Sequence, residues 1–307
     1  MTTAAAHRED TSSPRPVFPD VDAEAFSRDL QALRDELESA LGPEDRAHFE
    51  KIQRWGRLCT GLGYATAWVM PNPLSAMLIA QGNTARWTMM AHHVTHRGYD
   101  RVPGMPEQST NRRFATGWRR FLDWPDWIHP DAWRHEHNTL HHVRTGETAD
   151  PDLVEHNTEW LRRSSMPLWT KYGVVAFFAC TWKVTYYAPN TFFEWRRAER
   201  RRAGGPEEVG TPPLLEAFNP LSAEGRLFWK TCLLPYAGLR FALVPALFAP
   251  LGAWSVFSVF ANSVFAELLT NLQSFMVIAP NHAGDDLYRF EGRVDSRAAF
   301  AVRQVVG

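Results

Sequence analysis

Long apolar segments alternate along this chain with polar segments that contain histidine. The longest apolar run, residues 231–266, holds a single charged residue, Arg240. Because a membrane-spanning helix needs about 20 apolar residues, this run is long enough for most of two crossings. The Ala-Pro-Leu-Gly break at 249–252 predicts two helices, about 229–248 and 253–279, that form a hairpin.

A second candidate hairpin covers residues 57–90 and is divided by Pro-Asn-Pro at 71–73. Its first arm is only modestly apolar, and its second arm carries Arg86 near the end. A third apolar stretch, residues 172–182, is flanked by lysines and is about half the length of a span. This length favours an interfacial or buried helix over a crossing.

The distribution of arginine indicates the orientation of these hairpins. If both cross the membrane, the N-terminus, residues 91–228 and the C-terminus share one side, and cationic residues favour the cytoplasmic side. That side would carry Arg97, Arg101, Arg112, Arg113, Arg119, Arg120 and the basic run 196–202. We therefore expect an all-α, multi-pass integral membrane protein with a four-helix transmembrane stem and a helical cytosolic cap. A soluble helical protein with a very apolar core is the alternative.

Composition narrows the class of protein further. A chain of 307 residues with 45% hydrophobic content and 13 tryptophans is not disordered. The formal net charge of -1 gives no basic field for nucleic acid, so none is expected as a partner. The three cysteines are far apart in apolar surroundings, which excludes a disulfide framework. Residues 1–50 are expected to be a flexible region with an amphipathic helix at about 21–41, and residues 51–307 one membrane domain.

Histidine is concentrated in two short groups. Eight of the twelve histidines fall between residues 92 and 142, and seven of these lie in "HHVTH" (92–96) and "HEHNTLHH" (135–142). Each group contains a pair at i and i+4, so two rings project from one helix face and can bind one metal ion. Neutral imidazole suits iron, zinc, copper and nickel, whereas magnesium and calcium prefer oxygen ligands.

Two familiar zinc patterns do not fit these groups. A zincin would need histidine at position 139, where the chain has Thr139. A two-cysteine, two-histidine zinc finger would need nearby cysteines, but no cysteine lies within thirty residues of either group. A redox metal that activates dioxygen beside an apolar substrate is the use that most needs many neutral ligands. By the expected topology, His282 lies at the same membrane face as both groups. The candidate ligands are His92, His96, His137, His141, His142 and His282.

Nearby carboxylates are candidates for the residues that orient these rings. A carboxylate that accepts the second N–H of a ligating imidazole fixes its tautomer. The candidates for this role are Asp100, Glu136, Asp150, Asp152 and Asp285.

The two histidine groups, together with "TGETADPDL" at 145–153, resemble the first two histidine boxes of the integral-membrane fatty acid desaturases. The family boxes read H-x3-4-H and H-x2-3-H-H, and His92-x3-His96 and His137-x3-His141-His142 fit both. The resemblance runs from about residue 57 to the end. It implies two non-haem iron ions, dioxygen as co-substrate and removal of two hydrogens from an acyl chain. It also implies an additional ligand after the last membrane helix, a role that falls to His282.

The chain departs from the family at its C-terminal end. The family has a third histidine box after the last membrane helix, but residues 283–307 contain no histidine. The expectation from this departure is a chain that is incomplete at its C-terminus, with a natural variant that has a reduced site as the alternative.

The resemblance leaves several functions open. Related membrane hydroxylases and ketolases that act on lipids use similar histidine clusters, and a catalytically inactive fragment or a structural zinc site would show the same motifs. The expected partners are membrane lipids, a lipid or acyl-thioester substrate, and an external electron donor of the ferredoxin or cytochrome b5 type. The arginine-rich cap surface suits either docking of such an acidic carrier or contact with lipid headgroups.

Overall fold

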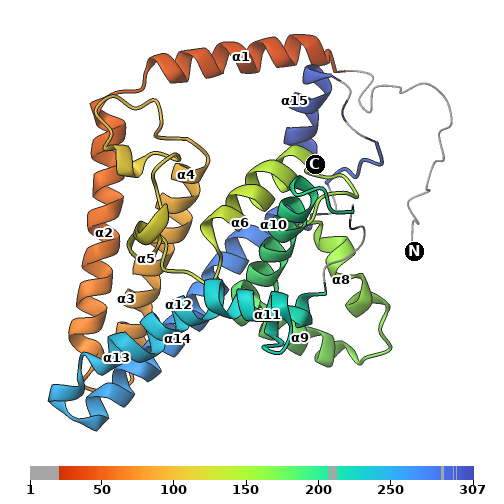
Figure 1. Ribbon diagram of the computed structural model, residues 1–307. Helices are drawn as coiled ribbons and strands as arrows, with labels where there is room; N and C mark the ends of the chain where they lie inside the picture. Colours follow the sequence, from red (N-terminus) through yellow and green to blue (C-terminus); the bar gives the residue numbers. More distant parts are fainter. Residues whose placement is uncertain (1–20, 207, 209–212, 285–286, 293, 295) are drawn as a thin grey trace.

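The computed structural model describes residues 21–206, 208, 213–284, 287–292, 294 and 296–307, and this part of the chain is built from helices (Figure 1). The described residues contain no named strand, only an isolated bridge between Glu147 and Phe290. The expected all-α class is therefore confirmed. The first helix, α1 (Ala23–Ser39), matches the amphipathic helix expected near the N-terminus and packs against the last helix, α15 (Arg297–Val306).

The first hairpin forms as predicted, although its helices extend beyond the apolar region. Helix α2 (Pro43–Ala67) is 25 residues long and is followed, after the Pro-Asn-Pro turn, by α3 (Pro73–Thr84). Helix α3 continues without a break into the π-helical segment η1 (Ala85–Ala91) and then α4 (His92–Thr95), which begins the first histidine group. The two arms approach closely: a Cβ added at Gly82 would lie 2.0 Å from the Thr60 hydroxyl oxygen. Glycine is therefore the residue that fits there.

The second hairpin also forms, with its break at the predicted Pro/Gly turn. Its second arm is α14 (Ala253–Ile278), followed by the 3₁₀ segment η10 (Ala279–His282). Its first arm runs over 223–251 as a chain of α, π and 3₁₀ segments: α11 (Ala223–Phe228), η7 (Trp229–Leu233), α12 (Leu234–Ala237), η8 (Gly238–Leu243), α13 (Val244–Ala246) and η9 (Ala249–Leu251).

Two helices in the described part of the chain are long and apolar enough to cross a membrane: Ala223–Leu251 and Ala253–His282. Only 28% and 44% of their most apolar windows are buried inside the protein. Because a core helix of a soluble protein would be mostly covered, this exposure favours lipid as their surroundings. The two helices of the second hairpin are thus candidate membrane spans, whereas the helices of the first hairpin do not reach the same length and hydropathy.

The short apolar stretch at 172–182 lies within α9 (Leu168–Trp182), which packs along α14. Helix α9 continues into the π-helical η5 (Lys183–Tyr187) and α10 (Ala188–Arg202), so one long helix runs from the side of α14 to the second histidine group. Most of the large apolar side chains of α9, among them Trp169 and Phe177, are exposed, so this helix is not buried in a protein core.

The remaining helices surround an aromatic core, and this region is called the cap below. This core includes the buried side chains of Trp87, Trp124, Trp133, Tyr187 and Phe192. The cap elements are η2 (Glu107–Ser109), η3 (Gly117–Arg119), α5 (Arg120–Asp123), α6 (Pro130–His135), η4 (Glu136–His141), α7 (His142–Arg144), α8 (Val154–Arg163) and η6 (Leu214–Phe218).

A buried amide, that of Asn262, helps to join the two hairpins. Asn262 on α14 donates hydrogen bonds from its side chain to the carbonyl oxygens of Ala67 and Met70, at 2.9 and 3.1 Å. Its side-chain oxygen accepts one from the Asn72 backbone N–H at 2.9 Å. These three bonds pair backbone groups at the turn between α2 and α3.

Candidate metal centre

The two histidine groups lie on separate helices that converge in the cap. The first group is on α4, directly after the π-helical turn η1, and the second is on η4, which is itself π-helical. A π turn bonds residues five apart, so it brings residues i+4 and i+5 to the same side as residue i. This local geometry turns both His141 and His142 toward His137, whose ring centroid lies 5.5 and 4.5 Å from theirs.

Four imidazoles gather around one point. The candidate ligand atoms of His92, His96, His137 and His142 all lie within 4.8 Å of one another. The Nε2 atom of His137 is 3.1 Å from the Nε2 atoms of both His92 and His142. Two nitrogens bound to one metal ion at about 2.0–2.1 Å are roughly 2.9–3.4 Å apart, so this spacing fits a shared ion.

A second ligand group adjoins the first. The ligand atoms of His137, His141 and Asp152 also lie within 4.8 Å of one another. From η10, directly after α14, His282 places its Nε2 atom 3.2 Å from Nε2 of His141. All six histidines predicted as ligands are therefore brought together, in two adjacent groups that share His137.

The second nitrogen of several rings is held by a partner that fixes the tautomer. The Nδ1–H of His141 points at the Asp150 carboxylate at 2.9 Å, and that of His282 at the Ile278 carbonyl oxygen at 2.9 Å. The Nδ1 atom of His137 lies 3.3 Å from the Tyr187 hydroxyl. With Nδ1 engaged in this way, each Nε2 presents its lone pair to the centre, which is the arrangement a ligating histidine needs.

The electrostatics keep most of these rings neutral. Burial, reinforced by the neighbouring imidazoles, lowers the pKa of His92 to about 3 and of His142 to about 4, and lowers the pKa of His137 further. For His141, burial lowers the pKa, but the hydrogen bond to Asp150 and the charges of Asp152 and Asp150 together outweigh it and raise the pKa. The buried Nε2 atom of His96 has no hydrogen-bond partner among the described residues. Neutral imidazoles with free lone pairs bind metal ions without first releasing protons.

The carboxylates predicted to orient the histidine rings differ in what they contact. Asp150 contacts His141 directly, as expected of an orienting residue. Asp152 lies close enough to be a ligand itself, and Glu136 is fully buried with neither carboxylate oxygen hydrogen-bonded among the described groups. Burial, with the nearby charge of Asp152, raises the pKa of Glu136 well above its usual range. Asp100 instead binds the backbone N–H of Asn111 in an exposed loop, and Asp285 lies outside the described residues.

Sequence reasoning missed the aromatic residues that support the centre. The indole of Trp133 stacks on His137 with ring centroids 4.0 Å apart, and Tyr187 reaches the same imidazole from η5. No spacing rule marks either residue, because each comes from a different helix and follows no histidine motif. The end of the chain also packs here: the Gln304 side chain on α15 donates to the His142 carbonyl oxygen at 2.9 Å.

A histidine-rich centre beside two membrane-capable helices is typical of a membrane protein whose histidines could hold metal. Comparison with known families agrees with this class. A family model described as fatty acid desaturase matches residues 66–305, well over half of the 307 residues. The chain therefore belongs to the fatty acid desaturase family, which makes it an oxidoreductase of lipid metabolism. No curated protein and no solved structure gave a significant match.

Proposed function

We propose that this protein is a membrane desaturase that introduces a double bond into an acyl chain. The reaction would use two iron ions, dioxygen and two electrons from an external donor of the ferredoxin or cytochrome b5 type. The observation that carries the proposal is the convergence of six imidazoles from three chain segments, with Nε2 atoms 3.1–3.2 Å apart where pairs face each other. This donor set suits iron, and the family match supplies the reaction class.

The chain's own residues hold and orient the metal in this proposal. His92, His96, His137 and His142 form one ligand group, and His141 and His282, with Asp152 beside them, form the other. Asp150 and Tyr187 act on the rings rather than on the metal, since each contacts an Nδ1 atom. When bound, the iron pair supplies the oxidising power needed to remove hydrogen from an unactivated methylene group.

We propose that both hairpins cross the membrane as a four-helix stem, with the histidine boxes on the cytoplasmic side. Helix α2 spans about 38 Å at about 1.5 Å per residue, and its outer face exposes Trp55, Leu58 and Leu62. The outer face of α3 exposes Leu74 and Met77 in the same way. Apolar outer faces on both hairpins support a shared lipid environment for the whole domain, residues 51–307.

The proposed function is tested by metal analysis and product analysis on the same preparation. The full natural chain, purified in mild detergent, should hold about two irons and little zinc. Membranes that contain it, supplied with an electron donor, should convert saturated acyl chains to unsaturated ones only when dioxygen is present. A hydroxylated product would reassign the reaction to the related hydroxylases, and a redox-silent metal with no dioxygen consumption would remove the enzymatic proposal.

A further inference from the structure

A short helical segment of the cap exposes three large apolar side chains on one face. Elements η3 and α5 follow each other without a gap over 117–123, and in them Trp118, Phe121 and Leu122 are 69%, 49% and 60% exposed. Positions i, i+3 and i+4 lie on the same side of a helix, so these side chains form one apolar patch, called the 118–122 patch below. The candidate metal centre does not use it.

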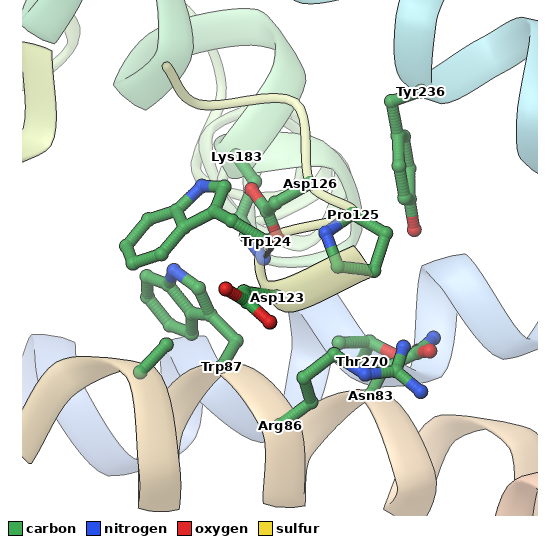
Figure 2. A pocket seen from close by; sticks show the side chains of 11 residues that line it. Asn83, Arg86, Trp87, Asp123, Trp124, Pro125, Asp126, Lys183, Tyr236 and Thr270 are labelled. Atoms are coloured by element: carbon green, nitrogen blue, oxygen red, sulfur yellow. Dashed lines mark hydrogen bonds and ion pairs between the residues drawn. The ribbon is translucent and has the colours of Figure 1, made fainter. Parts of the chain in front are cut away.

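The base of this segment is fixed by interior contacts. The Asp123 carboxylate accepts two hydrogen bonds from the Arg119 guanidinium, at 2.8 and 3.0 Å. Trp124 is buried, and Figure 2 shows it with Asp123 at a small internal cavity. Asp126 lines the same cavity and forms a buried ion pair with Lys183. The three apolar side chains are therefore presented on a rigid base.

The 118–122 patch lies beside the start of a candidate membrane span. The guanidinium of Arg120, in the same segment, donates a hydrogen bond to the Thr231 carbonyl oxygen. The candidate span Ala223–Leu251 has 29 residues, about nine more than a crossing needs. Its apolar run begins at 231, directly after Lys230, so the surplus residues lie at this end. If this helix crosses as proposed, the membrane surface is near Lys230, at the level of the patch.

Two cations beside the patch are not neutralised by acids. In the described part of the chain, neither Arg120 nor the exposed Lys230 forms an ion pair. Three arginines of α10 differ, because Arg196, Arg197 and Arg200 are each paired with a glutamate. An acidic partner would therefore find these α10 cations already neutralised, whereas the cations at the patch are available.

We infer that the 118–122 patch is a membrane anchor that enters the headgroup layer of an anionic leaflet. Tryptophan is enriched at membrane–water interfaces, where apolar side chains reach the acyl boundary and cations contact anionic headgroups. An acidic electron carrier would also attract the two cations, but three large apolar side chains beside a candidate span suit lipid better. This anchor rests on the membrane topology given under the proposed function and not on the proposed reaction.

The test is quenching of tryptophan fluorescence by brominated lipid in nanodiscs that hold the full natural chain. Because the sequence has 13 tryptophans, the Trp118 contribution is the difference between wild type and Trp118→Phe. Brominated lipid should quench this contribution strongly, and acrylamide in the aqueous phase should quench it weakly. Absence of quenching by the lipid overturns the inference. Protection of Trp118 from acrylamide by added ferredoxin would then identify a carrier-docking face instead.

Trp254→Phe separates failure of the anchor from failure of the topology. The Trp254 indole is 59% exposed near the start of α14, inside the second candidate span. Its contribution should be quenched by brominated lipid whenever the second hairpin crosses the membrane. A quenched Trp254 with an unquenched Trp118 overturns only the anchor, whereas two unquenched indoles overturn the proposed membrane stem as well.

The two cations are tested through lipid preference. Brominated phosphatidylserine should quench Trp118 more strongly than brominated phosphatidylcholine. Lys230→Gln and, separately, Arg120→Gln should each lower this preference about fivefold, as expected for one cation near an anionic surface. Arg202→Gln, at an exposed position at the end of α10, is the matched control and should leave the preference unchanged. Equal quenching of wild type by the two lipids would overturn the assignment to an anionic leaflet.

Discussion

The Nε2 atoms of His141 and His282 lie 3.2 Å apart, although 141 residues separate them in the chain. Each ring is fixed from behind, His141 by Asp150 and His282 by the Ile278 carbonyl oxygen. Because Ile278 is the last residue of α14, the position of this helix sets one wall of the candidate metal centre. A shift of α14 along its axis would separate the two nitrogens and weaken the binding of an ion between them.

Replacement of His137 by alanine should remove the ring that both ligand groups share. We expect double-bond formation to be lost and iron per chain to fall well below that of the wild type, while membrane insertion stays intact. Fatty acid profiles and iron content of purified protein measure both effects. His93→Ala is the matched control, because this exposed imidazole neighbours His92 but bonds the Met89 carbonyl oxygen instead. Full activity in the His137 variant would refute the site.

Asp150→Asn should weaken metal binding without removing a ligand. An amide can still accept the His141 Nδ1–H but carries no charge, and loss of such an orienting carboxylate typically costs about 10–100-fold in metal affinity. Competition with a chelator of known affinity measures the change. Asp100→Asn, in the exposed loop, should behave as wild type. Equal affinities for the two variants would show that Asp150 does not orient the ring.

The neutral state of His92 should make the metal-free protein sensitive to acid. Its folded-state pKa of about 3 is below the ordinary value of 6.5, so the unfolded chain takes up the proton first as the pH falls below about 6.5. Wild type should lose stability relative to His92→Asn by at most about 1.4 kcal/mol per pH unit between pH 6 and pH 4. Glu136 and Asp152 affect the pH dependence of stability in the opposite direction, but both proteins contain them, so the comparison cancels their contributions. Denaturant unfolding at each pH measures the difference in free energy of unfolding between the two proteins. A difference that does not change with pH would contradict the neutral state assigned to His92.

The buried pair Lys183 and Asp126 should tolerate joint replacement better than single replacement. Removal of one partner leaves an uncompensated charge in the interior and typically costs about 3–5 kcal/mol. Lys183→Met and Asp126→Leu should each lower the free energy of unfolding by about that amount, and the double variant should recover much of the loss. A double-mutant cycle by thermal or denaturant unfolding measures the coupling. Strictly additive losses would show that the two charges do not depend on each other.

The sequence predicted the parts of this protein that depend on local patterns. The hairpin breaks at 71–73 and 249–252 follow from proline and glycine, and all six candidate ligands follow from histidine spacing and from the position of His282. The roles of Trp133 and Tyr187 could not be predicted, because they arise from the packing of distant helices against His137. Nor does helical periodicity indicate the π turns, since a single inserted residue leaves no distinct signal in the hydrophobic pattern.

The amide of Asn262 also constrains how the protein is made. The turn between α2 and α3 exposes backbone groups of Ala67, Met70 and Asn72 that are paired by a side chain about 190 residues further along the chain. A ribosome that has just released the first hairpin has not yet synthesised that side chain. If the first hairpin crosses the membrane as proposed, it enters the bilayer with an unfinished turn that is completed only when α14 arrives beside it. Biogenesis of the N-terminal half is in this sense completed by the C-terminal half.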